Sequence, residues 1–226
     1  MDGDVGVSVE IELVSVPRQE THSPEYLAIN PLGKDGDVGI TESVAILTYL
    51  ARTYGTDPKL DHWLPGAQGA ERRGANGARP SPVPESRVVS AMSWHESALR
   101  PTCMCVVFQV ALVPLRGLRR SEAVLKQFGL PGLHVAMDAI EEVWLRDSRF
   151  VAGDEVSVAD LLIATELDML HICLEEPFSY ATLVESRPKL VEYLARVKEA
   201  CAPHYAEILQ PVLNFRAALE RRRSKA

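Results

Sequence analysis

Residues 65–84 read PGAQGAERRGANGARPSPVP, and this segment constrains the fold of the chain more than any other. Gly, Pro, Ala and Arg make up most of it, and large apolar side chains are almost absent. Such a stretch cannot bury enough surface to offset the entropy lost on ordering it. We therefore predict a flexible linker over residues 61–84, which separates a domain over residues 1–60 from a second domain over residues 85–226.

Before the linker, the hydrophobic pattern indicates a mixed α/β unit. Apolar and polar residues alternate over residues 7–13, VSVEIEL, which is typical of a strand with one buried face. A loop follows, with a helical turn over residues 24–28 and a second, short strand over residues 38–41. Residues 42–54 carry a broad apolar face and end at Gly55, so they predict a helix.

After the linker, the pattern is helical throughout. Residues 86–99 are one predicted helix, and Ser157 and Asp160 form a capping-box start to another, buried helix. Three further stripes have helical spacing and predict core faces: Leu133, Met137, Ile140 and Trp144; Leu190, Tyr193, Leu194 and Val197; and Tyr205, Ile208, Leu209, Val212 and Leu213. The second domain is therefore predicted to be all-helical, which gives an α+β chain.

Charge and composition exclude several classes of protein. Apolar residues make up 46% of the chain and charged residues 24%, which fits a folded globular protein. A net charge of −7 argues against a general binder of nucleic acid or of membranes, because phosphate surfaces attract a basic footprint. The basic run Arg221–Arg223 is interpreted as a solvated helix end. Residues 1–4 carry acids and no signal-peptide pattern, so we expect a cytoplasmic protein.

The four cysteines do not predict a metal or redox site. Cys103 and Cys105 are one residue apart, while Cys173 and Cys201 are remote from them, and no C-x-x-C pair occurs. Four cysteines in a chain of this length do not form a disulfide framework either. We interpret Cys103 and Cys105 as buried thiols in a helix, with a reactive thiol at one of them as the alternative.

Six phrases of the sequence, in this order, resemble the cytosolic glutathione transferases, most closely the theta class. They are YLAINPLGK at residues 26–34, DGD at 35–37, ITESVAILTYL at 40–50, SWHESALR at 93–100, FVAGDEVSVADLL at 150–162 and SRPKL at 186–190. Their order and spacing match the family over most of the chain, apart from the linker.

The resemblance implies a fold and a reaction. The fold would be a thioredoxin-like N-terminal domain that binds glutathione, followed by an all-α domain that lines the pocket for the electrophile. The reaction would be attack of the glutathione thiolate on a small electrophile, since the thiolate and not the thiol is the nucleophile. Glutathione is then a co-substrate and no other cofactor is implied. The family also implies a homodimer.

Five residues of this chain match positions that contact glutathione or face the site in the family. Glu42 and Ser43 open a predicted helix, where free backbone N–H groups and a hydroxyl suit the carboxylate of the γ-glutamyl group and the Glu carboxylate suits its ammonium. By the same resemblance, His22 and Lys34 would contact glutathione, and Arg100 would face the site from the helical domain. A solvated His22, a surface Lys34 and a helix-capping Arg100 are the alternatives.

Two departures from the family bear on catalysis. The family begins with a strand, a loop that carries the catalytic hydroxyl, and a helix, whereas this sequence starts near the second strand. Ser15 superficially resembles the catalytic serine, but the short distance to Pro31 leaves no room for the helix and strand that should intervene. Lys34 also runs directly into Asp35, so the strand that opens with a cis-proline is missing. The thioredoxin-like domain is thus predicted to be incomplete, and the catalytic residue stays unknown.

These departures leave two alternatives to a transferase. One is a non-catalytic, transferase-like module with a degenerate glutathione site, which uses its helical domain to bind other proteins. The other is a fragment or spliced form without stable activity. An exposed apolar patch on the helical domain, where the first domain should pack, would favour the interaction module.

Overall fold

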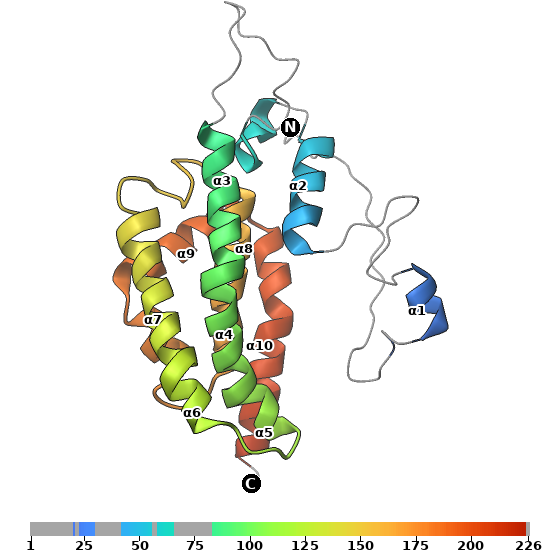
Figure 1. The fold of residues 1–226 in the computed structure, drawn as a ribbon, viewed down its shortest axis with the longest axis vertical. Helices are drawn as coiled ribbons and strands as arrows, with labels where there is room; N and C mark the ends of the chain where they lie inside the picture. Colours follow the sequence, from blue (N-terminus) through green and yellow to red (C-terminus); the bar gives the residue numbers. More distant parts are fainter. Residues whose placement is uncertain (1–19, 21–22, 30–41, 56–57, 66–82, 225–226) are drawn as a thin grey trace, which may run out of the picture. The chain divides into compact units, whose positions relative to one another are not determined.

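The computed structural model describes residues 20, 23–29, 42–55, 58–65 and 83–224, and the chain divides into two compact units, Met1–Pro80 and Ser81–Ala226 (Figure 1). The predicted strands at residues 7–13 and 38–41 lie outside the described residues. Every helix and turn given below belongs to one unit or the other, and each unit is considered by itself.

The first unit contributes two short helices and one 3-10 turn to the described part. Helix α1 spans Pro24–Ile29 and begins where the backbone N–H of Tyr26 donates to Ser23 Oγ at 3.1 Å. Helix α2 spans Ser43–Tyr54 and ends at Gly55, whose N–H donates to Ala51 O, as the sequence predicts. A 3-10 turn follows over Pro58–Trp63.

The second unit opens with one long helix, and here the prediction of a helix ending at residue 99 is wrong. Helix α3 spans Val83–Trp94, α4 spans Arg100–Val107 and α5 spans Val113–Leu115. Two π-helical segments, His95–Leu99 and Phe108–Leu112, join them without a break. Pro101 does not end the helix, because the preceding π segment is where the hydrogen-bond register changes: Arg100 N donates to His95 O, five residues back.

A second continuous helix runs over residues 122–144. It consists of α6 (Glu122–Val124), a π segment (Leu125–Gly129), α7 (Leu130–Ala139) and a second π segment (Ile140–Trp144). Close packing on α4 needs a residue without a side chain at Gly132, since an added Cβ would lie 2.5 Å from Cγ2 of Thr102. Most of the predicted core stripe is confirmed: Leu133, Met137 and Ile140 are buried, whereas Trp144 is half-buried.

Helix α8, Val158–Asp168, lies at the centre of this unit (Figure 1). It packs against α3, α4, α9 (Pro188–Ala200) and α10 (His204–Arg223). A 3-10 turn, Met169–Ile172, continues α8, and a π segment, Ala181–Glu185, precedes α9. The stripe on α9 is buried as predicted, whereas the stripe on α10 is wrong in part, because Tyr205 is buried but Ile208 is 58% exposed.

The start of α8 is held by the predicted capping box. One carboxylate oxygen of Asp160 accepts bonds from Ser157 N and Ser157 Oγ, both at 2.8 Å. The other oxygen accepts from Val151 N and from the hydroxyl of Tyr193 on α9, both at 3.0 Å. Burial raises the pKa of the Asp160 carboxyl, and the four donors oppose that shift.

The other end of α8 carries a second buried carboxylate, Asp168. It accepts hydrogen bonds from the hydroxyls of Tyr180 and Tyr205 at 3.2 and 2.8 Å, and from Nζ of Lys198 at 3.2 Å. Burial is the first cause that raises the pKa of the Tyr205 hydroxyl, and the neighbouring Asp168 adds to it. Asp160 and Asp168 therefore tie the two ends of α8 to α9 and α10.

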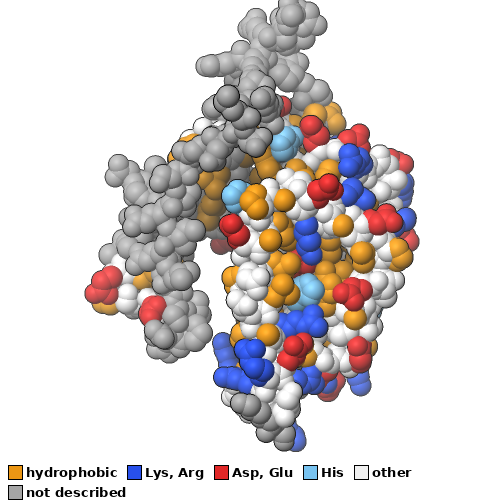
Figure 2. Space-filling view, turned by 180° about the vertical axis from the view of Figure 1, so that it is seen from behind, with side chains coloured by type: hydrophobic (Ala, Val, Ile, Leu, Met, Phe, Trp, Pro, Cys, Tyr) orange, Lys and Arg blue, Asp and Glu red, His pale blue; other side chains and the backbone are white. Residues whose placement is uncertain are grey.

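The long helix Val83–Leu115 also has the length and hydropathy of a membrane-spanning helix, with a mean hydropathy of 1.6. In the structure α3 packs against α8, and α4 packs against both α7 and α8, while 39% of the apolar stretch is buried inside the unit. A core helix passes the same test of length and composition, which makes this weak evidence for a span. The surface of the unit mixes apolar residues with charges of both signs (Figure 2).

The carboxylate of Asp160 should be essential for the stability of the helical unit. Asp160→Asn leaves a neutral amide, whose NH₂ faces N–H and O–H donors in a buried site. We expect the free energy of unfolding to fall by about 3 kcal/mol. Urea unfolding followed by circular dichroism measures this, with Glu155→Gln as the control for an exposed carboxylate on the same segment. A loss no larger than that of the control would contradict the role given to Asp160.

Candidate functional site

The predicted site residues fall on both units. Glu42 and Ser43 lie at the start of α2 in the first unit, and Arg100 lies at the start of α4 in the second. His22 and Lys34 lie outside the described residues, so their roles stay predictions. Ser15, the weak candidate for the catalytic hydroxyl, lies outside them as well.

Glu42 has an unusual backbone conformation. Its φ is 70° and its ψ is 126°, and among the described residues other than glycine it is the one with a positive φ. Such a conformation costs on the order of 1–3 kcal/mol and is concentrated at ligand-binding and catalytic positions. The strain at Glu42 therefore points to a functional position at the start of α2, independently of the sequence motif.

The conformation of Glu42 determines which polar groups at the start of α2 are available to a ligand. Its carbonyl accepts the first helical bond, from Ile46 N at 3.0 Å, while its side chain makes no capping bond. The N–H groups of the first turn precede that bond, and the positive end of the helix dipole lies there. Glu42 and Ser43 are both exposed. This end of α2 can therefore offer N–H donors and a hydroxyl to a carboxylate, with the Glu42 carboxylate beside them for an ammonium group.

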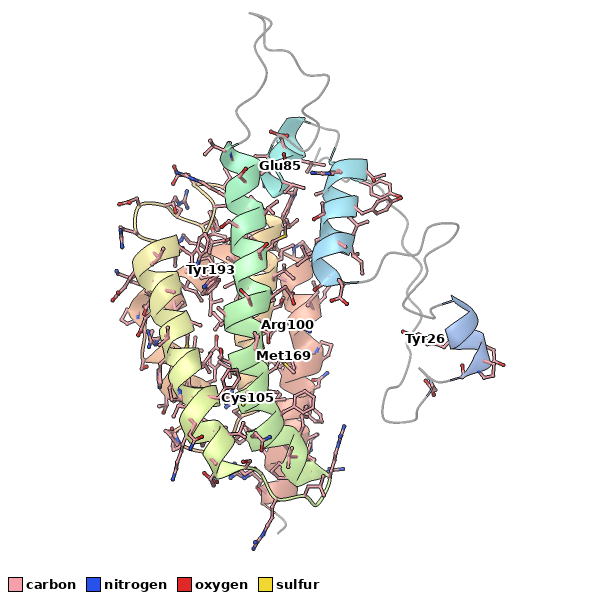
Figure 3. The ribbon with its side chains drawn as sticks, in the orientation of Figure 1. Tyr26, Glu85, Arg100, Cys105, Met169 and Tyr193 are labelled. Atoms are coloured by element: carbon pink, nitrogen blue, oxygen red, sulfur yellow. The ribbon has the colours of Figure 1, made fainter. Side chains whose placement is uncertain are left out.

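In the second unit, Arg100 lies at the start of α4 (Figure 3), and a buried carboxylate holds its side chain. Its Nη1 donates to Oε2 of Glu166 at 2.9 Å, and its Nε lies 3.9 Å from Oε2 of Glu96. The side chain of Glu166 is 4% exposed, whereas that of Arg100 is 48% exposed. The alternative that Arg100 caps a helix end is wrong, because the helix continues through it. Arg100 instead presents a fixed, half-exposed cation on the surface of the helical unit.

His95 belongs to the same polar cluster as Arg100, Glu96 and Glu166, and it lies in the interior of the unit. It is fully buried, its Nε2 lies 3.4 Å from Oε2 of Glu166, and its Nδ1 lies 3.2 Å from Oε1 of Glu96. The thiol of Cys103 donates to the backbone carbonyl of Glu166 at 3.2 Å. The cluster thus links α4 and α8 through groups that are expensive to bury unless they are paired.

Sequence reasoning missed Glu166 and His95. Glu166 stands in the apolar run LLIATELDML of α8, and a charged residue in the middle of a buried helix was the signal that could have identified it. His95 gave no comparable signal. Its position depends on the π segment His95–Leu99, which no simple pattern in the sequence predicts.

Cys103 is buried in α4 as predicted, whereas Cys105 on the same helix is only half-buried. Burial raises the pKa of the Cys103 thiol well above its usual range, raises that of Cys173 to about 12 and raises that of Cys201 to about 11. Since a thiolate is needed for nucleophilic attack, these three thiols are unsuited to it. In the part of the chain that the structure describes, no three His, Cys, Asp or Glu side chains are placed to hold a metal ion.

Comparisons with known proteins show the family to which this chain belongs. The family model "Glutathione S-transferase, N-terminal domain" matches residues 4–52, and "Glutathione S-transferase, C-terminal domain" matches residues 103–200. Human glutathione S-transferase theta-2B is 31% identical over 214 residues, which cover 90% of this chain and 78% of the human protein. Mouse glutathione S-transferase theta-3 is 30% identical over 199 residues, which cover 85% of this chain and 73% of the mouse protein.

The solved structures that this chain resembles are also theta-class glutathione transferases. The crystal structure of human glutathione transferase theta-2 in complex with glutathione has a TM-score of 0.76 at 27% identity, over 98% of this chain and 82% of that one. A human theta-class transferase with the glutathione conjugate of 1-menaphthyl sulfate has a TM-score of 0.72 at 28% identity, over 96% and 83%. The chain is therefore of the class that joins a thioredoxin-like N-terminal domain to a helical one. It belongs to the glutathione S-transferase family, in which it resembles the theta class, as the sequence phrases predicted.

The pair formed by Arg100 and Glu166 should stabilise the helical unit measurably. Glu166→Gln removes the charge that faces Arg100 and His95, and the half-exposed guanidinium recovers part of its hydration. We expect a loss of about 2 kcal/mol in the free energy of unfolding, measured by urea titration. Glu142→Gln, an exposed carboxylate on the helix that contains α7, is the matched control. Equal stability of the two variants would show that Glu166 does not hold Arg100 in solution.

Proposed function

We propose that this protein is a glutathione transferase that conjugates glutathione to small electrophiles. The observation that carries the proposal is the pair Glu42 and Ser43 at the start of α2, with its strained backbone at Glu42, which offers complementary groups to both charges of a γ-glutamyl moiety. The similarity to theta-class transferases, one of them solved with glutathione, supports the same assignment.

Several residues of the chain take part in the proposed binding of glutathione. The N–H groups of the first turn of α2 and the Ser43 hydroxyl hold the γ-glutamyl carboxylate, and the Glu42 carboxylate holds the adjacent ammonium. His22 and Lys34 are proposed as further contacts to glutathione, by resemblance to the family. Arg100, kept in place by Glu166, is proposed to face the site from the helical unit. The catalytic hydroxyl is assigned to no residue.

The proposed reaction requires the protein to bind glutathione and to activate its thiol. Glutathione supplies the nucleophile, and its thiolate sulfur attacks an electrophilic carbon, so no further cofactor is needed. The protein binds the tripeptide and lowers the pKa of its thiol. The electrophile binds on the helical unit, where the exposed cation of Arg100 favours substrates or leaving groups that carry or develop negative charge.

The domain organisation is also part of the proposal. We propose a partial thioredoxin-like domain over residues 1–60, without the strand that opens with a cis-proline, a linker over residues 61–84, and the helical domain over residues 85–226. The two family-model matches, which fall on either side of this linker, support it.

A cytoplasmic homodimer with a role in detoxification fits these features. A row of exposed apolar residues on the helix over residues 122–144, namely Val124, Phe128 and Val135, supports the dimer, because it is a surface that a second copy can cover. The family resemblance supports the compartment and the detoxifying role.

Isothermal titration of the full chain with glutathione, carried to millimolar ligand, tests the proposal. We expect binding with micromolar to low-millimolar affinity. Glu42→Ala and Ser43→Ala should each weaken it by about tenfold or more, because each removes one charge-assisted hydrogen bond. Thr53→Ala, at the exposed far end of α2, is the control for a change on the same helix and should leave the affinity unchanged.

The opposite result has a definite meaning. A chain that gives the circular dichroism of a folded helical protein and yet releases no heat with glutathione would refute the transferase proposal. The non-catalytic interaction module would then be the better reading of the helical unit. Binding that survives both substitutions would keep the activity but move its site away from the start of α2.

A further inference from the structure

The fold gathers arginines from two remote segments at one end of the helical unit. One segment is the loop over residues 116–121, which follows α5, and the other is the last turn of α10. Arg120 and Arg223 both pair with the carboxylate of Glu175, the latter at 3.8 Å, and Arg223 Nη1 also donates to Leu174 O at 2.8 Å. Figure 1 shows the end of α5 and the C-terminus at the same end, and in Figure 2 Lys and Arg side chains cluster there.

Four other arginines at this end are not paired in this way. Arg116, Arg119, Arg221 and Arg222 are exposed, and no carboxylate among the described residues pairs with them. A run of arginines at a helix end is by itself a solvated surface, which is how the sequence alone is interpreted. The fold places Arg116 and Arg119, which are remote in the sequence, at the same end of the helical unit as Arg221 and Arg222. The six arginines of the two segments exceed the acids among them, Glu122, Glu175 and Glu220, by three, so the local charge is +3 although the whole chain carries −7.

Exposed apolar side chains accompany these arginines. Leu118 lies in the same loop and is 61% exposed, and Leu115, at the end of α5, is 38% exposed. An apolar groove of about 260 Å³ opens beside them, with Arg222 and Arg223 among its lining residues. The other residues that line it are mostly apolar: Val110, Ala111, Pro114, Leu115, Ile172, Leu174, Leu219 and Glu175. We call this surface, formed by residues 114–119 and 219–223, the basic end.

We propose that the basic end binds the surface of a membrane that contains anionic phospholipids. Arginines attract the phosphate and carboxylate groups of such a surface, and exposed leucines enter the boundary between headgroups and acyl chains. The arginine stems can lie along apolar surface while their charged ends remain in water. The binding is peripheral, and the proposal does not depend on the transferase activity.

The leucines distinguish a membrane from a soluble polyanion. A nucleic acid or another polyphosphate would use the arginines, but it would gain nothing from Leu118, which is largely exposed at the tip of the loop. A bilayer uses both kinds of side chain. Electrostatic attraction to the membrane should contribute about fivefold in partition coefficient for each arginine that reaches the surface.

Cosedimentation of the full chain with vesicles tests this proposal. Vesicles of phosphatidylcholine alone are compared with vesicles that also contain phosphatidylserine, at low ionic strength. We expect binding to the anionic vesicles only, lost in about 1 M salt, where charges are screened beyond about 3 Å. The variant with Arg116, Arg119, Arg221 and Arg222 all changed to Ala should bind at least about tenfold more weakly. Leu118→Ser should also weaken binding, with the salt dependence retained.

A matched control separates local from total charge. A variant with Arg87, Arg146, Lys189 and Arg196 all changed to Ala loses the same charge from other parts of the helical unit, and it should bind as the unchanged chain does. Circular dichroism checks that every variant is folded.

Three outcomes would overturn the proposal. The first is no binding to anionic vesicles at low salt. The second is an equal loss of binding in the control variant, which would make the effect one of total charge. The third is binding that Leu118→Ser leaves unchanged and that heparin reproduces with similar strength, which would assign the basic end to a soluble polyanion.

Discussion

The buried carboxylate of Asp160 is the interaction on which the helical unit depends. It accepts four hydrogen bonds, from the segment before α8, from the N-terminus of α8 itself and from Tyr193 on α9. A carboxylate buried in this way is stable only when its donors are all in place, so it fixes both where α8 begins and how α9 crosses it. Since α8 packs against α3, α4, α9 and α10, its position sets those of its neighbours.

The position of α8, which Asp160 fixes, also affects the part of the candidate site that lies in the helical unit. Glu166 lies on α8, so the start of that helix also determines where this carboxylate meets Arg100 and His95 on the long helix. The π segment His95–Leu99 shifts the register of the long helix immediately before Arg100. The buried carboxylate of Glu166 on α8 and the π segment before α4 together hold the half-exposed guanidinium of Arg100 in place. In the first unit the comparable element is the strained backbone of Glu42 at the start of α2.

The sequence predicted the family, the helical unit and the capping box, because these depend on local signals such as Ser157 and Asp160 at fixed spacing. It did not predict that the helix continues past Pro101, since that depends on the π segment His95–Leu99, which no simple pattern in the sequence predicts. It also missed the partners of Arg100. Glu166 lies far from Arg100 along the chain, and a contact between such remote residues produces no hydrophobic pattern in the sequence. The basic end likewise combines two remote segments, so the run Arg221–Arg223 alone did not predict it.

The most direct test of the account is hydrogen exchange of the full chain with and without saturating glutathione. The account predicts that the backbone amides of residues 43–45, at the start of α2, exchange more slowly when glutathione is bound. The amides of Asp160 and Leu161, at the start of α8, already donate to the backbone carbonyl of Ser157 and should not change. Protection at the start of α2 would place the γ-glutamyl group there. No change in α2, or protection confined to the helical unit, would contradict the claim that Glu42 and Ser43 form the glutathione site.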